Sequence, residues 1–485
     1  MSDVFSEDVV SLDNLFSKLD LEETLIVLSS KPKDSVVDKV MEQCCLPLSK
    51  SHHGVEVRIG TTPSNHGCLI VNWKDNEGLT LFEKRWLLNT LTNSIKANGS
   101  KSLAVFLSDE GCRDQLIMAD DLYAAFCDPV DCELKLASYR LLCQRAIDEN
   151  GADFHRSVRS KYFVEFKKWV NANPDEMTSL EIARRLGDFA KKFRCTYEVL
   201  DEVAIKEKGL NLLAAVGQAS TRSPSRLILL SHGCDSAKEA PLLLVGKGVT
   251  FDTGGINVKP HDRFVNCMKN DMGGAALLSQ IFMALVESGY DRPIALAIPS
   301  CENLVAQNSM KPGSVVTGYN GKKVVIEHTD AEGRLILADA LSYAEELFQP
   351  RQIVVAATLT TAAMIQFSNF YTPAHFLDEK QKAKLQGVGE KWGELFTFWD
   401  RFLPFSDCNN TPITDLTNMG RMPGALPASG GSMIAAHFLK NFCTAPMCHF
   451  DIFASTWNWS GTYPGPDFGA TGAPFNSLFE WTYGL

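Results

Sequence analysis

The chain has 485 residues, of which 45% are hydrophobic and 22% charged, and its formal net charge at pH 7 is −11. This length predicts two domains rather than one. The acidic balance argues against a nucleic-acid partner, because phosphate binding needs a basic surface. No apolar run is long enough to cross a bilayer, so we expect no membrane partner.

The amino-terminal segment and the cysteines bear on the cellular compartment. The acidic start at residues 1–8 lacks the basic residues and the apolar run of a signal peptide. The 14 cysteines are scattered and show no paired CxxC spacing of a zinc site. Free thiols in a reducing compartment are the better interpretation, so we expect a cytoplasmic location.

The first third of the chain alternates strand-like and helix-like segments, which indicates a small α/β domain over residues 1–158. The predicted strands are 24–30, 55–60, 68–73 and 102–108, and a helix is predicted over 81–97. From 159 to 195 the pattern becomes helical and more charged. Thr178 and Glu181 have capping-box spacing there, and we expect a helical connector between domains.

Strands and helices alternate strictly over residues 196–485, the expected second domain. The predicted strands are 226–230, 241–245, 293–299, 324–327 and 352–358, and the predicted helices are 272–288 and 332–348. This order predicts the α/β class, with a mixed, mostly parallel sheet flanked by helices. Charged residues gather where strands end and helices begin, which is the edge where open α/β sheets bind ligands.

Two short segments concentrate these charges. They carry Lys247, Asp252, Lys259, Asp271, Asp330, Glu332 and Arg334. Four carboxylates in one cleft need cations to neutralise them, so the pattern predicts a pair of divalent ions and a two-metal hydrolase. Oxygen-rich ligation suits Mg²⁺, Mn²⁺ or Zn²⁺. Each residue alone is better explained as loop punctuation or as a partner of a helix dipole, but that explanation does not extend to all seven.

The three cationic side chains have different expected roles. Between two metal ions an ammonium group is disfavoured, so Lys247 is the candidate for a neutral amine ligand. Lys259 and Arg334 are expected to stay charged and to contact the substrate or an anion. Other hydrolytic chemistries lack their motifs: Asp252-Thr-Gly254 has no second copy, as an aspartic protease requires, and no Gly-x-Ser-x-Gly elbow is present.

Two segments resemble the hallmark sequences of the cytosolic leucyl aminopeptidases, a family of dinuclear metallo-aminopeptidases. These are Val245-Gly-Lys-Gly-Val-Thr-Phe-Asp252-Thr-Gly-Gly255 and Thr329-Asp-Ala-Glu-Gly-Arg-Leu335. The likeness extends through 213–220, 358–360, 429–431, 449–451 and 469–472, and so covers most of the last 280 or so residues. The resemblance implies release of N-terminal amino acids from peptides with free N-termini. It also implies a homohexamer whose subunits have a macro-like N-terminal domain and a C-terminal catalytic domain.

The resemblance also implies roles for individual residues. One metal ion, zinc or manganese with magnesium as a further option, would be held by Asp252, Asp330 and Glu332. The second ion would be held by Lys247, Asp252, Asp271 and Glu332. Lys259 would polarise the scissile carbonyl, and Arg334 would hold a bicarbonate ion as general base. The substrate pocket would be lined by Met268, Thr358, Leu359, Thr361 and Phe453.

The chain departs from the family pattern at a few positions. His328 stands where the family usually has Asn, and we expect it to make a hydrogen bond rather than bind metal. An extra residue lies within 259–264. Thr361 and Phe453 stand where Gly and Ala are usual, which predicts either a narrower pocket or a shifted backbone with unchanged specificity. The alternative function is a catalytically silent family member that acts as a structural or binding oligomer.

Overall fold

In the computed structural model the described residues are seven strands between Phe5 and Cys143, followed by 152–234, 240–260, 262–399, 407–420, 430–459 and 469–485. They form two compact units, and the boundary between Val164 and Glu165 lies inside helix α4 (Ala152–Asn171). The domain limits expected at 158/159 and 195/196 remain predictions.

The first unit contains a seven-stranded sheet. Its strands are β1 (Phe5–Val9), β2 (Glu23–Ser29), β3 (Cys45–His52), β4 (Val55–Thr61), β5 (Gly67–Trp73), β6 (Ser102–Leu107) and β7 (Ser138–Cys143). The order is β1-β7-β6-β2-β5-β4-β3, in which β3 and β4 run antiparallel to their neighbours. All four strands predicted in this region are present, whereas the helix predicted over 81–97 lies outside the described residues.

The second unit is organised around a nine-stranded sheet with the order β17-β16-β19-β15-β10-β12-β9-β8, and β11 pairs with β12. These strands are β8 (Thr196–Leu200), β9 (Arg226–His232), β10 (Leu242–Gly246), β11 (Gly248–Asp252), β12 (Ile294–Asn303), β15 (Gln352–Ala357), β16 (Tyr371–His375), β17 (Leu395–Trp399) and β19 (Met447–Asp451). The central strands β12, β10, β15 and β19 are parallel. Strands β8, β9 and β16 introduce antiparallel pairs, so the predicted mixed, mostly parallel sheet is confirmed.

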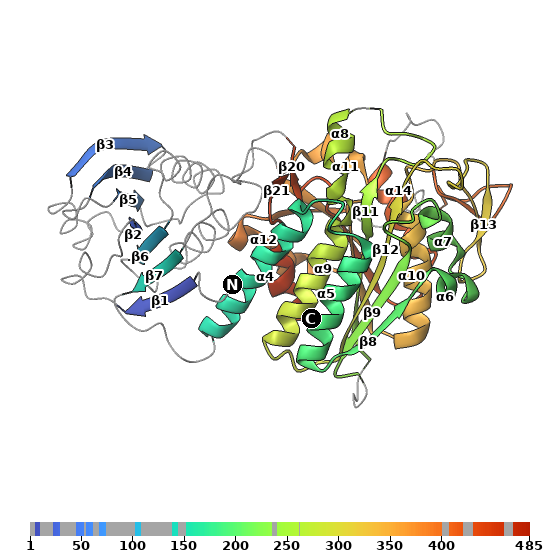
Figure 1. The fold of residues 1–485 in the computed structure, drawn as a ribbon, viewed down its shortest axis with the longest axis horizontal. Helices are drawn as coiled ribbons and strands as arrows, with labels where there is room; N and C mark the ends of the chain where they lie inside the picture. Colours follow the sequence, from blue (N-terminus) through green and yellow to red (C-terminus); the bar gives the residue numbers. More distant parts are fainter. Residues whose placement is uncertain are drawn as a thin grey trace. The chain divides into compact units, whose positions relative to one another are not determined.

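Helices cover both faces of this sheet (Figure 1). They are α5 (Ser179–Phe193), α6 (Glu202–Glu207), α7 (Asn211–Gly217), α8 (Asp262–Cys267), α9 (Gly273–Glu287), α10 (Gly333–Phe348), α11 (Thr361–Phe367), α12 (Glu379–Trp392), α14 (Gly431–Lys440) and α15 (Phe475–Tyr483). Helices α7, α10 and α14 share a hydrophobic core with one face. Helix α9 packs on the other face and contacts α5 and α15. The fully buried apolar runs of β10 and β15 explain their central positions.

Short strands complete the unit. Strands β13 (Val315–Thr317), β14 (Lys323–Val325) and β18 (Leu416–Thr417) form a small sheet, and β20 (Trp457–Asn458) pairs with β21 (Gly469–Ala470). At the start of α5 the Thr178 hydroxyl accepts the Glu181 amide, which is one half of the predicted capping box. The Glu181 carboxylate binds Arg184 and Arg185 instead of completing the box.

The start of α9 packs directly on the ends of two central strands. A Cβ at Gly274 would lie 2.1 Å from the Ala356 carbonyl oxygen, and one at Gly246 would lie 2.5 Å from the Gly274 carbonyl oxygen. Only glycine permits this approach. The Ala275 amide donates to the Lys247 carbonyl at 2.8 Å, so the beginning of α9 is fixed beside the end of β10.

Candidate metal centre

The charged residues predicted from the sequence come together at the carboxyl edge of the second sheet. Lys247 follows β10, and Asp252 is the last residue of β11. Asp271 lies in a 3₁₀-helix, Met268–Met272, directly before α9. Asp330 and Glu332 lie in the loop that enters α10. Parallel strands end at the same edge, which is why segments about 80 residues apart converge here.

Lys247 lies at the bottom of the cluster, and its side chain is 3% exposed. Its Nζ is 2.7 Å from Asp271 Oδ1 and 2.9 Å from Glu332 Oε1, and it donates to the Thr358 carbonyl at 2.8 Å. A Cβ at Gly333 would lie 2.6 Å from Lys247 Cε. The glycine at the start of α10 therefore provides the space that the lysine side chain occupies.

Lys259 makes the second set of ion pairs. Its Nζ is 2.7 Å from Asp252 Oδ2 and 2.5 Å from Asp330 Oδ1. The loop that carries it turns sharply at Gly254 (φ 89°) and Gly255 (φ 67°), a region of backbone conformation that glycine adopts without strain. Each ammonium group thus lies between two carboxylates, and the two groups together contact all four acidic residues.

Charge balance determines the protonation of the cluster. Four buried or half-buried carboxylates face two lysines, so negative charge is in excess when no other cation is present, and this excess opposes ionisation of some of the acids. Burial raises the pKa of Asp271 well above its ordinary value and that of Asp330 to about 8. For Glu332 burial also opposes ionisation, but Lys247 and Lys259 outweigh it and hold the pKa at about 2. Burial lowers the pKa of each lysine, but the surrounding carboxylates raise it by more. The net pKa is therefore raised, and both lysines stay charged.

The residues present suit divalent cations. Acidic ligand atoms of Asp252, Asp271 and Glu332 all lie within 4.8 Å of one another. Asp271 Oδ2 and Glu332 Oε2 are buried, and neither has a hydrogen-bond partner among the described residues. Buried carboxylate oxygens without a donor are costly unless a cation or ordered water meets them. The oxygen donors match hard and borderline ions.

A second polar group lies beside this centre. Arg334, the second residue of α10, is 7% exposed, and its Nε makes no hydrogen bond within the described part of the chain. Burial lowers its pKa to about 10, so the guanidinium stays charged at neutral pH. Burial, and to a smaller extent the charge of Arg334, lowers the pKa of His449 to about 3, so that imidazole is neutral at neutral pH. A buried cation with a free donor is suited to bind an anion.

Asp451, the last residue of β19, shapes the turn after β15. Its Oδ1 accepts the amides of Leu359 and Thr360 at 3.2 and 3.3 Å, and its Oδ2 accepts the Thr360 hydroxyl at 2.6 Å. The carboxylate is fully buried. Through these bonds it fixes the backbone whose Thr358 carbonyl contacts Lys247.

His328 makes the expected hydrogen bond. Its Nδ1 accepts the Asp330 amide at 3.2 Å, and its backbone carbonyl accepts Asn418 Nδ2 at 2.7 Å. An asparagine side chain at this position could accept the same amide two residues ahead, as in an Asx turn. Burial lowers the pKa of His328, which favours the neutral ring that this bond needs.

The five residues predicted to line the substrate pocket differ in their exposure to solvent. Met268, Thr358 and Phe453 are buried, Leu359 is half-buried, and Thr361 is exposed at the first turn of α11. Thr358 Oγ1 donates to Asp271 Oδ1 at 2.9 Å, which ties this residue directly to the cluster. A substrate role for the five residues remains a prediction.

Sequence reasoning missed two residues that hold the cluster in place. Asn303 Nδ2 donates to Asp252 Oδ1 at 2.8 Å, and Asp451 organises the turn described above. Each is the last residue of a parallel strand, β12 and β19 respectively. The rule that sites form at this edge would have identified both, had the predicted strand at 293–299 been extended to Asn303 and the strand at Met447–Asp451 been predicted.

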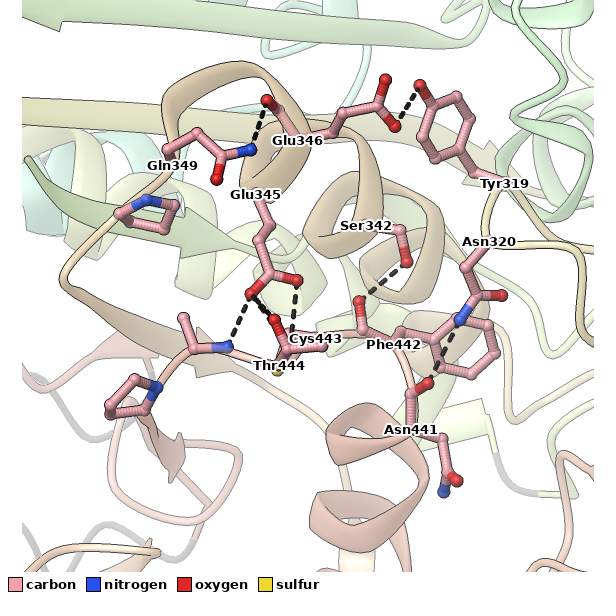
Figure 2. Close-up of a pocket in the computed structure, with 13 residues that line it drawn as sticks. Tyr319, Asn320, Ser342, Glu345, Glu346, Gln349, Asn441, Phe442, Cys443 and Thr444 are labelled. Carbon is pink, nitrogen blue, oxygen red and sulfur yellow. Dashed lines mark hydrogen bonds between the residues drawn. The ribbon is translucent and has the colours of Figure 1, made fainter. Parts of the chain in front are cut away.

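A separate surface pocket of about 630 Å³ lies at the other end of α10 (Figure 2). Glu345 accepts the Thr444 and Ala445 amides there, and Glu346 accepts the Tyr319 hydroxyl. The helix places this pocket ~18 Å from Arg334 along its axis. Its polar groups bind one another, and it takes no part in the cluster.

The domain is of the mixed α/β class, and it places buried carboxylates and lysines at the carboxyl edge of its sheet. Such a site is suited to bind divalent cations. The model of the cytosol aminopeptidase family, catalytic domain, matches residues 165–479. The chain therefore belongs to the cytosol aminopeptidase family. Among the described residues, no helix combines the length and apolar character needed to cross a membrane.

Individual relatives agree with this assignment. The chain is 37% identical over 331 residues to a probable cytosol aminopeptidase of Albidiferax ferrireducens. This match covers 68% of the chain and 66% of the relative, so the chain spans just under two thirds of the relative's length. It is 30% identical over 397 residues to one of Hydrogenovibrio crunogenus, covering 81% and 77%. The fold is similar to the bottromycin maturation enzyme BotP in complex with Mn, with a TM-score of 0.76, 23% identity and coverage of 96% and 99%.

Proposed function

We propose that this chain is a metal-dependent aminopeptidase that releases N-terminal amino acids from peptides. The observation that carries the proposal is the buried cluster of Asp252, Asp271, Asp330 and Glu332 with two lysines, at the sheet edge where the family's hallmark segments meet. Family membership supports peptide hydrolysis as the reaction. The unsatisfied carboxylate oxygens support the requirement for metal.

We assign two divalent ions to this site, zinc or manganese, with magnesium as a further option. Asp252, Asp330 and Glu332 would hold one ion, and Lys247, Asp252, Asp271 and Glu332 the other. The ions would supply Lewis-acid activation of water and of the scissile carbonyl. For Lys247 to ligate, its ammonium group must lose a proton, and the arrival of cations beside it favours that loss.

The remaining residues act on the substrate. Lys259 is charged and reaches the outer part of the cluster, with 13% of its side chain exposed, so it can donate to the carbonyl oxygen and stabilise the developing oxyanion. Arg334 would orient a bicarbonate ion that accepts the proton of the attacking water. The turn at Thr358 and Leu359, fixed by Asp451, would position the peptide beside them.

Two further features of the whole protein belong to this proposal. We propose a homohexamer in which the macro-like N-terminal domain, residues 1–158, serves assembly, with 159–195 as a connector and 196–485 as the catalytic domain. We also propose a cytoplasmic location, which the names of the relatives support. Analytical ultracentrifugation would test the hexamer independently of activity.

The experiment that tests the proposed activity is amino-acid release from a panel of unblocked dipeptides. Chelated protein is reconstituted with Mn²⁺ or Zn²⁺, and N-acetylated dipeptides serve as controls. We expect metal-dependent cleavage confined to free N-termini, lost in Asp271→Asn and kept in Glu346→Gln, an acidic residue on the far end of α10. No cleavage by protein that holds two ions per chain would refute the activity and favour the silent oligomer.

A further inference from the structure

Asn303 connects the two segments that form the centre. It ends β12, is 2% exposed, and lies opposite Asp252 in the pairing of β11 with β12. Its Nδ2 donates to Asp252 Oδ1 at 2.8 Å and to the Thr329 carbonyl at 3.1 Å. One side-chain amide therefore uses both of its hydrogens, one on each metal-ligating segment.

The backbone of Asn303 makes the same connection. Its carbonyl accepts the Thr253 amide and the Thr253 hydroxyl, both at 2.9 Å. A Cβ at Gly255 would lie 2.8 Å from Asn303 Oδ1, so the glycine turn closes directly against this side chain. The loop that carries Asp252 and Lys259 is thus held by Asn303 from two sides.

The two carboxylate oxygens of Asp252 have different partners. Oδ1 accepts the Gly254 amide at 2.8 Å and the Asn303 amide at 2.8 Å. A carboxylate has about four acceptor positions, two on each oxygen, so these two donors fill Oδ1. Oδ2 faces the cluster, where it meets Lys259 at 2.7 Å. Oδ2 is the oxygen left for cations.

We propose that Asn303 is a positioning residue that commits Asp252 to bind metal through Oδ2 alone, and that keeps the Asp330 and Glu332 segment in register with it. This inference rests on the proposed metal-dependent function. A donor is required, because an aspartate here would place another carboxylate oxygen beside Asp252 Oδ1, where the Asn303 amide now lies at 2.8 Å. Asparagine and aspartate have nearly the same shape, so exchanging them tests donation rather than packing.

The first test measures metal binding of folded, metal-free protein by calorimetric titration with Mn²⁺ and with Zn²⁺. Partners that orient metal ligands typically affect affinity 10- to 100-fold. We expect a loss of ~10- to 100-fold in Asn303→Ala and at least as great a loss in Asn303→Asp. The matched control is Asn409→Ala, a fully buried amide that donates to the Thr417 carbonyl and does not contact the centre. A merely structural role would lower the thermal midpoint of the Asn303 variants and leave their affinity unchanged, which would overturn the inference.

A second measurement does not depend on whether the variants fold. In a crystal structure of the Mn²⁺-loaded natural sequence, we expect Asp252 to ligate through Oδ2 while Oδ1 keeps the Gly254 and Asn303 amides. If each Asp252 oxygen binds a different ion and Asn303 has turned away, the inference fails and the proposed function stands. If the natural sequence binds no metal, the proposed function fails first and the inference with it.

Discussion

Replacement of Gly333 by alanine tests whether Lys247 depends on the space that this glycine leaves. A Gly→Ala change near the start of a helix ordinarily stabilises it, by up to ~1 kcal/mol. Here the new Cβ would lie 2.6 Å from Lys247 Cε and 2.8 Å from Nζ. Ordinary contact requires the lysine to move by about 1 Å. The end of a lysine is usually free to move, but this one is held by Asp271, Glu332 and the Thr358 carbonyl.

The contacts of Nζ with Glu332 and Asp271 set the size of the effect. Moving Nζ about 1 Å from ionised Glu332, now at 2.9 Å, weakens that attraction by roughly 1.5 kcal/mol at an effective dielectric constant near 20. Loss of the charged hydrogen bond from Nζ to Asp271, now at 2.7 Å, costs about 1.5 kcal/mol more. The two losses, about 3 kcal/mol together, exceed the gain in helix propensity, so we expect net destabilisation of about 2 kcal/mol. The side chains are almost fully buried, so little of this is screened by solvent.

Urea unfolding of the metal-free protein measures the difference, with Gly387→Ala as the matched control. Gly387 lies in α12, and a Cβ at this position would meet no described atom within 4 Å, so alanine there should stabilise by ~0.5–1 kcal/mol. The reasoning is refuted if Gly333→Ala raises the unfolding free energy as Gly387→Ala does. Weaker Mn²⁺ binding in the Gly333 variant would further connect the displaced lysine to the centre.

Three other predictions concern separate residues. His328→Asn should retain most activity, because asparagine can accept the Asp330 amide. His328→Ala lacks this acceptor and should lose ~10-fold in metal affinity, measured by calorimetry. Equal affinities of the two variants would show that this hydrogen bond does not support metal binding. Burial raises the pKa of Asp339 to about 7 although backbone amides donate to it, so the folded state holds a proton that the unfolded chain releases near pH 4. The unfolding free energy should therefore fall as pH rises from about 4 to about 7, by at most ~1.4 kcal/mol per unit, and urea unfolding of Asp339→Asn should lack this component of the slope; identical slopes would refute it. Phe453→Ala should change the ratios of kcat/KM for Leu, Ala and Met substrates if Phe453 narrows the pocket, and unchanged ratios would leave the shifted-backbone alternative.

The sequence predicted the centre of the fold better than its margins. Strands β10 and β15 are continuous apolar runs buried on both faces, so composition alone located them. Strand β17, by contrast, was not predicted, although four of its five residues are apolar or aromatic; it lies at the edge of the sheet and is half-buried along its length. Helix α10 was located within one residue; its residues 333–344 are all buried, and its two adjacent glutamates, Glu345 and Glu346, lie near its end.

The failure to predict Asn303 follows from one misplaced strand end. The strand predicted from the sequence ended at Pro299. The strand instead continues to Asn303, because β11 pairs alongside its second half from Ser300 onward. Asn303 consequently belonged to a loop in the prediction and to the site edge in the structure. Local sequence could not reveal this, since the partner strand lies about 50 residues earlier.

The two lysines also bear on how the proposed metal ions would enter the centre. Many small metallo-domains fold only when metal neutralises their mutually repelling ligands. Here Lys247 and Lys259 already neutralise part of the carboxylate charge, so the centre does not depend on metal for all of its charge balance. On the proposed function, metal uptake would therefore replace lysine ion pairs in a folded site rather than drive folding. Exchange of one metal ion for another would then require no unfolding of the chain.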